Sequence, residues 1–219
     1  MQRRQFLKGS LALAGLSLAP AARMLAAPAA DWSLASKSIN VDRLDTVALS
    51  IEGSLPEGFC GQLFRNGPAR RERAGHRHRH WFDGDGMVHR YDIAGGEIRH
   101  QARYVQTSKY RREQAEGRFL YSATGTPLPD SEPLGNNDTG NTANTALLPW
   151  DDEVLALWEG GSAYRVDPSS LDTLGRHDWR DDLKHMPFSA HPVTDRDGTL
   201  WNFGSAPYAG ENGMLFVYR

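Results

Sequence analysis

The densest group of potential metal ligands in the sequence is GHRHRHWFDGDGMVHRYD, residues 75–92. On a strand, His76, His78 and His80 would share one face, with about 6.6 Å between successive histidines. Histidine nitrogens bind zinc at about 2.0–2.1 Å, so two neighbours could chelate an ion but all three could not share it. The intervening arginines would also repel a cation. We therefore predict a solvated structural strand in which His80 supports the turn that follows.

The two Asp-Gly steps at residues 83–86 invite a calcium interpretation, which the rest of the sequence does not support. An EF-hand loop needs a longer ligand series that ends in glutamate, and that series is missing. Because Asp-Gly is a strong hairpin signal, we expect a turn here without metal. Hydrolase and nucleotide motifs are absent as well: there is no Gly-x-Ser-x-Gly elbow and no Walker or Rossmann loop, and nothing around Cys60 marks it as a nucleophile.

Short strands must position whatever chemistry the chain performs. After residue 30, runs rich in β-branched and aromatic residues alternate with turn signals. The predicted strands form three groups: residues 61–67, 78–82, 87–93 and 97–107; residues 144–149, 153–159, 162–168 and 171–179; and residues 188–193, 199–205 and 214–219. Repeated groups of four antiparallel strands predict an all-β fold of the β-propeller type, here an incomplete propeller of roughly three blades. A β-sandwich is the alternative.

A long polar segment, residues 112–141, separates the first two groups and is rich in Gly, Pro, Asp and Asn. A loop of this length in a compact domain is usually a binding lid or an insertion. Its apolar trio Phe119, Leu120 and Tyr121 would allow a peripheral contact with a membrane or an apolar substrate. The commoner role of such a trio is to anchor the loop to the body of the domain.

The strand pattern draws attention to His191, which is predicted to lie in the first strand of the third group. In a propeller, the first strand of a blade lines the central channel, where an inward histidine can meet residues of other blades. A lone histidine in a strand is more often simply packed or hydrogen-bonded. The residue type alone does not distinguish these two roles.

The first 29 residues have the pattern of an export signal. A basic start is followed by an apolar run, residues 11–19, which is too short to span a bilayer, and by an Ala-x-Ala cleavage site at residues 27–29. The pair Arg3-Arg4 resembles a twin-arginine signal, so we predict a periplasmic or secreted protein that begins near residue 30. The domain would occupy residues 30–219.

The charge and cysteine content of the chain restrict its possible partners and cross-links. Removing the signal takes away four of the 25 basic residues and none of the 27 acidic ones, which leaves a formal charge of −6. A mildly acidic chain has no electrostatic footprint for nucleic acid. Since Cys60 is the single cysteine, no disulfide can form within the chain.

Six stretches together resemble the carotenoid cleavage oxygenases, also known as the retinal pigment epithelial membrane protein family. They occur in the family's order over nearly all of the predicted mature chain: LPEGFCGQLFRNGPA, HWFDGDGMVHRYDI, RYVQT, NTANTALL, LALWEGGSAYRVDPSSLDTLG and SAHPVTDRDGTLWNFG. The resemblance implies a seven-bladed β-propeller that holds Fe(II) on its axis through four histidines. It also implies oxidative cleavage of a conjugated carbon–carbon double bond in a polyene by dioxygen, although a few relatives isomerise retinoids.

The resemblance assigns roles to four residues. His191 matches the first iron ligand, and neutral imidazole suits Fe(II). Glu159 matches a glutamate that accepts the N–H of another iron-binding histidine and thereby fixes its tautomer. Thr145 resembles the threonine whose methyl group crowds an open iron position. Trp158 stands where stilbene-cleaving relatives are expected to carry a lysine, and its aromatic face suits a long polyene, so the substrate prediction is a carotenoid or apocarotenoid.

The resemblance also predicts that three of the four iron ligands are missing from this sequence. No residue matches the other three iron-binding histidines, and His177 and His185 stand at the wrong positions to replace them. We expect that a chain ending at residue 219 is a truncated, inactive portion of such an enzyme. The alternative from another class is a non-catalytic secreted propeller segment that binds a ligand or partner through residues 112–141. Stilbene cleavage is the alternative within the enzyme class.

Overall fold

The computed structural model describes residues 31–206 and 213–219. The predicted signal at residues 1–29 lies outside this part of the chain. Two compact units are distinguished, residues 1–36 and 37–219. Of the first, the structure describes residues 31–36, which contain the 3-10 helix η1 (Trp32–Ser36). The remaining description concerns the second unit. None of the helices within the described ranges has the length and apolar composition needed to cross a bilayer.

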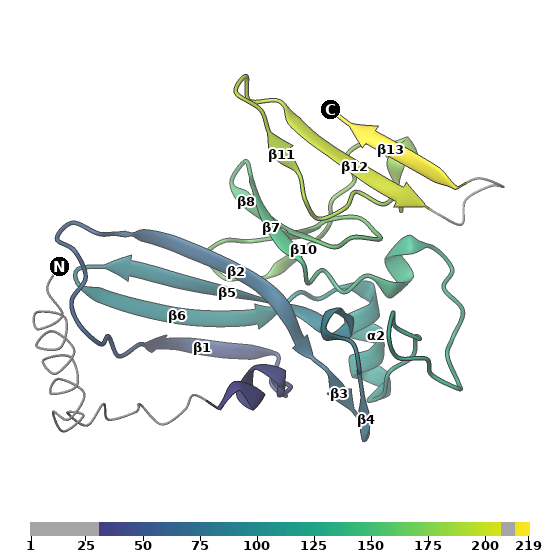
Figure 1. Ribbon diagram of the computed structural model, residues 1–219, viewed down its shortest axis with the longest axis horizontal. Helices are drawn as coiled ribbons and strands as arrows, with labels where there is room; N and C mark the ends of the chain where they lie inside the picture. Colours follow the sequence, from purple (N-terminus) through teal and green to yellow (C-terminus); the bar gives the residue numbers. More distant parts are fainter. Residues whose placement is uncertain (1–30, 207–212) are drawn as a thin grey trace, which may run out of the picture. The chain divides into compact units, whose positions relative to one another are not determined.

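The first sheet contains four antiparallel strands in the order β1-β6-β5-β2 (Figure 1). Their bounds are Arg43–Ala48 for β1, Gly61–Arg70 for β2, Asp85–Ala94 for β5 and Glu97–Tyr104 for β6. The predicted strand at residues 78–82 is wrong. The structure instead has a small hairpin, β3 (Glu72–Arg73) and β4 (His76–Arg77), followed by the 3-10 helix η2 (Trp81–Asp83). The fourth strand is β1, which the sequence pattern missed because five of its six residues are exposed.

The second sheet confirms four predicted strands and has the order β10-β9-β8-β7. Their bounds are Ala146–Trp150 for β7, Glu153–Leu157 for β8, Tyr164–Val166 for β9 and Thr173–Arg176 for β10. The short 3-10 helix η4 (Asp181–Leu183) follows. Asp151 has a φ of 49° in the β7–β8 hairpin, so the predicted turn is also confirmed.

The third sheet has three strands, β11 (Val193–Thr194), β12 (Leu200–Ala206) and β13 (Met214–Tyr218). The predicted first strand, residues 188–193, is mostly wrong because pairing begins at Val193. Ser189 has a φ of 73°, which is incompatible with a strand, and Pro192 has no N–H to donate. His191 therefore lies just before the strand in which it was predicted.

Two apolar clusters join these sheets. Val88 of β5 packs with Tyr164 and Val166 of β9, and Phe64 of β2 lies against them. Leu155 and Leu157 of β8 pack with buried residues of the segment before β11, Phe188 and Ala190, and with partly buried Leu200 and Tyr218 of the third sheet. These two parts of the core thus lie between successive sheets.

The Asp83–Gly86 element is not a hairpin turn, contrary to the prediction. Asp85 and Gly86 begin β5, and a Cβ atom at Gly86 would lie 2.2 Å from the carbonyl oxygen of Ala143. Gly86 is therefore required for a close backbone approach. Asp83 accepts hydrogen bonds from the backbone N–H groups of Thr124 and Gly125. The turn between β5 and β6 is made by the predicted glycine pair at residues 95–96.

The predicted loop at residues 112–141 begins with the end of a helix and contains a second one. The helix α2 (Ser108–Glu116) is capped by Thr107, whose side chain accepts the N–H of Tyr110, and it ends at Gly117 with a φ of 68°. The 3-10 helix η3 (Asn137–Gly140) lies near the loop's end. The apolar trio at residues 119–121 is buried, so the anchoring interpretation is confirmed.

Helix α2 carries a buried group of charges that we call the α2 charge cluster: Arg73, Asp85, Lys109 and Glu113. The Lys109 Nζ lies 2.9 Å from Asp85 Oδ1 and 2.8 Å from Glu113 Oε2. Arg73 approaches the same two carboxylates at 3.6 and 4.0 Å. The cluster fastens the helix to β5 and to the β3–β4 hairpin.

The histidine run is structural, but it is not a solvated strand. His78 is buried and its ring packs at a tilt against Phe119 with 3.9 Å between centroids, whereas His76 and His80 are exposed. The Nδ1 atom of His80 accepts the N–H of Phe82, which confirms that His80 supports the following turn. Burial, together with the nearby Lys109 charge, lowers the pKa of His78 to about 4.

Candidate functional site

The candidate residues lie where strands β7 and β8 end. The Thr145 N–H donates to the Leu157 carbonyl oxygen at 3.0 Å, which extends the β7–β8 ladder by one step. Antiparallel register then places Thr145 opposite Trp158. The sheet therefore brings together two residues that are 13 positions apart in the sequence.

The Trp158 indole packs on the glycine pair that follows it. A Cβ atom at Gly160 would lie 2.9 Å from Trp158 Cη2, and one at Gly161 would lie 3.1 Å from Trp158 Cε3. Trp158 is half-buried. The two glycines therefore give the indole a flat backbone surface, which explains why small residues follow the tryptophan.

Glu159 and His191 contact one another directly. The His191 Nε2 lies 2.6 Å from Glu159 Oε1, and Ser189 Oγ donates to Glu159 Oε2 at 3.2 Å. The side chains of His191 and Glu159 remain 63% and 52% exposed. Both groups are therefore held by hydrogen bonds while staying open to other molecules.

This contact orients the imidazole. When neutral His191 donates from Nε2 to the carboxylate, Nδ1 keeps a lone pair that can accept a proton or coordinate a cation. An iron site needs more donors than this. Within the described ranges, no group of three or more His, Cys, Asp or Glu side chains could hold a metal ion. The donors present here do not complete an Fe(II) site.

The structure brings the four predicted site residues to one end of the second sheet. It differs from the resemblance in one contact, since Glu159 is hydrogen-bonded to His191 and not to another histidine. His177 packs edge-on against Trp179 and His185 binds Asp138, so neither joins the pair. The iron-ligand and substrate roles of these residues stay predictions.

Two residues near the pair escaped sequence reasoning. Ser189 holds Glu159 through its hydroxyl, and Asp138 binds the turn that follows Glu159. No sequence signal marks Ser189, because serine before a strand is common. Asp138 lies in NNDTGNT, a polar stretch that is typical of loops.

The model of the family described as "Retinal pigment epithelial membrane protein" matches residues 38–219. The chain belongs to this family. The apocarotenoid-15,15'-oxygenase of Synechocystis is 38% identical over 159 residues, covering 68% of this chain and 32% of the relative. The isoeugenol monooxygenase of Pseudomonas putida is 31% identical over 171 residues, covering 78% and 35%. The chain thus spans about a third of the length of these relatives.

A solved structure of one relative has a fold similar to that of this chain. Cobalt-substituted Synechocystis apocarotenoid oxygenase matches with a TM-score of 0.66 and 33% identity, covering 80% of this chain and 39% of that one. This likeness confirms the predicted β-propeller fold class, with the sheets described here as part of the propeller.

Further solved forms of that oxygenase carry substitutions at a threonine, a tryptophan and a glutamate. Their order and sequence spacing in that protein equal those of Thr145, Trp158 and Glu159 here.

Proposed function

We propose that the protein to which this chain belongs cleaves a conjugated carbon–carbon double bond of a carotenoid or apocarotenoid, using Fe(II) and dioxygen. The observation that carries the proposal is the meeting of Thr145, Trp158, Glu159 and His191 at one sheet end. Support comes from the relative in which a threonine, a tryptophan and a glutamate with the same spacing were chosen for substitution. That relative also accepts cobalt by substitution, which supports a metal in the family's site.

Each residue has a defined task in this proposal. Glu159 accepts a hydrogen bond from the Nε2–H group of His191 and fixes its tautomer, which leaves Nδ1 as the atom that can bind a metal. Ser189 holds the second carboxylate oxygen, which restricts the rotation of Glu159. Trp158 offers an aromatic surface to a flat, apolar chain of conjugated carbons. Thr145 places a methyl group opposite Trp158 at the same end of the sheet.

The remaining iron ligands are proposed to come from sequence outside residues 31–219. The described residues contribute one imidazole and no further cluster, so no reaction step is assigned to them. Their contribution is to position one donor and one apolar surface. This division agrees with the chain's coverage of about a third of its relatives.

The substrate class is tested by comparing two conjugated alkenes. The protein, expressed from its complete coding sequence, is loaded with Fe(II) and given an apocarotenal or a hydroxystilbene under oxygen, and the carbonyl products are measured by chromatography. We expect products from the apocarotenal. Cleavage of the stilbene alone would instead place the protein with aryl-alkene oxygenases, of which the isoeugenol enzyme is an example by name.

Two histidine variants test whether iron binding and product formation depend on the candidate site. His191→Ala should remove both bound iron and product formation, because it removes a ligand. His76→Ala changes an exposed histidine of the β4 hairpin and should leave both unchanged. A protein that binds no iron and leaves both alkenes intact would favour the non-catalytic alternative, which binds a ligand through residues 112–141.

We also propose that residues 1–29 direct export by the twin-arginine route. The basis is the Arg3-Arg4 pair before an apolar run. Residues 1–36 fused to a reporter should reach the periplasm. Replacing both arginines by lysine should abolish that transfer, whereas unchanged export would exclude this route.

A further inference from the structure

Three segments of the chain converge on one buried carboxylate, that of Asp138 in η3. The first segment is η3 itself, the second is the turn at residues 159–162, and the third is the stretch at residues 185–191 that carries His191. Asp138 is 5% exposed. A buried carboxylate is stable only when hydrogen bonds replace its water, so its partners are informative.

Asp138 binds the turn that follows Glu159. Its Oδ1 accepts the Ser162 N–H at 2.8 Å, and its Oδ2 accepts the Ser162 hydroxyl at 2.9 Å. The Asn141 amide donates to Asp138 Oδ1 at 3.0 Å and to the Ser162 carbonyl at 2.8 Å. The approach is so close that a Cβ atom at Gly161 would lie 2.7 Å from Asp138 Oδ1.

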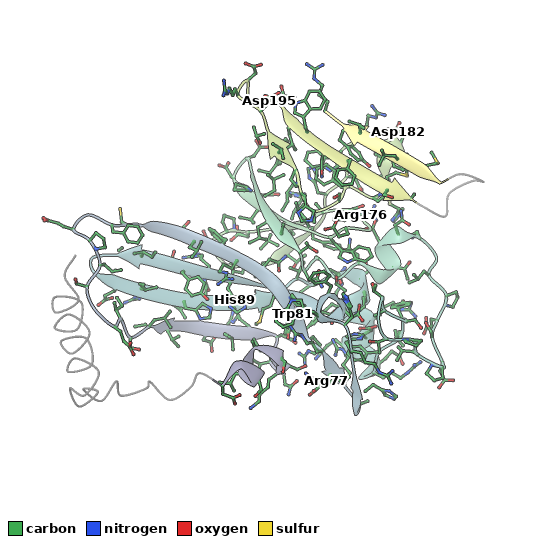
Figure 2. All side chains as sticks on the ribbon, in the orientation of Figure 1. Arg77, Trp81, His89, Arg176, Asp182 and Asp195 are labelled. Atoms are coloured by element: carbon green, nitrogen blue, oxygen red, sulfur yellow. The ribbon has the colours of Figure 1, made fainter. Side chains whose placement is uncertain are left out.

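The same carboxylate binds the segment that leads to His191. The His185 Nδ1 lies 2.9 Å from Asp138 Oδ2. Arg176, labelled in Figure 2, places its NH1 3.7 Å from the same oxygen. Further along, the Phe188 N–H donates to the Gly161 carbonyl at 3.0 Å. The turn and the histidine segment are therefore joined to each other as well as to Asp138.

We propose that Asp138 is a positioning residue for the Glu159–His191 pair. The pair depends on two backbone segments that no strand pairing connects, since Glu159 follows β8 and His191 precedes β11. Asp138 holds both segments through hydrogen bonds in a buried environment, where such bonds are strong. Without it, the turn and the segment can separate, and the 2.6 Å contact is lost.

The proposal rests on the proposed function only for its effect on catalysis, so the first measurement needs neither iron nor substrate. In the 219-residue chain with labelled histidine and glutamate, nuclear Overhauser contacts between the His191 ring and the Glu159 side chain report the pair directly. Asp138→Ala should lose these contacts at temperatures far below unfolding. Asp138→Asn keeps one acceptor oxygen and should retain them in part.

The matched control is Asp152→Ala, which removes an exposed carboxylate in the hairpin at the opposite end of β8. It should keep the His191–Glu159 contacts. The proposal is overturned if Asp138→Ala keeps wild-type contacts. If Asp138→Ala does not fold, Asp138→Asn decides: wild-type contacts in that variant reject the proposal, and weakened contacts support it.

The second measurement uses the iron-loaded protein expressed from its complete coding sequence. Because a misplacement of about 1 Å can cost about 100-fold in rate, Asp138→Asn should lower kcat by a factor of that order with little change in KM. An unchanged kcat would overturn the positioning role. If wild-type protein shows no turnover, the proposed function fails, while the magnetic resonance result still decides the role of Asp138.

Discussion

Two regions of the molecule pair carboxylates with basic side chains in opposite environments. In the α2 charge cluster, the side chains of Lys109 and Glu113 are 3% and 0% exposed. In the candidate site, His191 and Glu159 are 63% and 52% exposed. Both pairs have short contacts, of 2.8 and 2.6 Å. Distance alone therefore does not separate a structural pair from one available for chemistry.

Burial makes the difference. In the cluster, burial raises the pKa of Glu113, and no group there can exchange its partner for water without cost. Although burial opposes the charge of Lys109, the adjacent Asp85 and Glu113 carboxylates raise its pKa above the ordinary value. The exposed pair contributes little to stability, and its groups can exchange partners with solvent or a ligand. The cluster therefore serves the fold, and the pair is free to serve function.

The largest effect is expected when the buried α2 charge cluster is disrupted. Glu113→Ala leaves Lys109 with one carboxylate in place of two, and we expect a loss of about 3–5 kcal/mol in the free energy of unfolding. Urea denaturation measures it. Glu116→Ala, an exposed position on the same helix, should change stability by less than about 0.5 kcal/mol. Equal effects at both positions would mean that the cluster does not stabilise the helix.

The second prediction uses the histidine beside the cluster. Native His78 binds its proton only near pH 4, whereas the unfolded chain binds it near pH 6.5. Below pH 6.5 the unfolded state therefore holds more protons, so His78 by itself should lower the stability by about 1.4 kcal/mol per pH unit as pH drops from 6.5 towards 4. Denaturation series at several pH values would show this slope.

Removing the imidazole isolates its share of that slope. In His78→Leu, the pH dependence of stability should lose the contribution of one proton. His76→Ala should keep the wild-type slope because His76 is exposed. Burial also lowers the pKa of His89 to about 4, so a residual slope is expected in every variant. An unchanged slope in His78→Leu would show that His78 is not buried in its neutral form.

The third prediction tests the close backbone contact that lies between the two regions. Gly86 follows Asp85 of the cluster and touches the backbone of Ala143, two residues before Thr145. Gly86→Ala should cost about 1–3 kcal/mol because the backbone must move. Gly67→Ala, on the neighbouring strand, meets no atom within 4 Å and should cost less in the same thermal or urea experiment. Similar costs for the two variants would contradict the close approach.

The smallest effect on stability is expected when the exposed Glu159–His191 pair is disrupted. Glu159→Gln should change the free energy of unfolding by less than about 1 kcal/mol, because the carboxylate is half-exposed. The His191–Glu159 contacts in magnetic resonance spectra should nevertheless change. Asp152→Ala is the control. A large stability loss in Glu159→Gln would show that the pair stabilises the fold as the α2 charge cluster does.

Sequence patterns predicted the strands of the second sheet well because short runs rich in apolar residues are separated by turns that contain Asp or Gly. They failed where burial came from other segments. The run at residues 78–82 looks like a strand, yet His78 is covered by Phe119 of a distant loop. The Asp83–Gly86 element reads as a turn, yet its glycine is needed for contact with Ala143. Local patterns carry no information about such partners.

Part of the candidate site could likewise be selected from the sequence, and part could not. Resemblance selected Thr145, Trp158, Glu159 and His191, and the structure placed them together. The partner of Glu159 and the roles of Ser189 and Asp138 depend on where separate segments meet, so spacing along the chain did not reveal them.

By itself, the sequence determined the all-β class and most strand positions, since these follow from side-chain period and turn chemistry. It also contained the stretches whose resemblance to an oxygenase family selected the site residues. Only the tertiary structure decided which charges are buried and which are open. Burial is a property of the neighbours that folding supplies, and those neighbours come from residues far apart in the chain. The same reason explains why one histidine became a neutral core residue and another an exposed partner of Glu159.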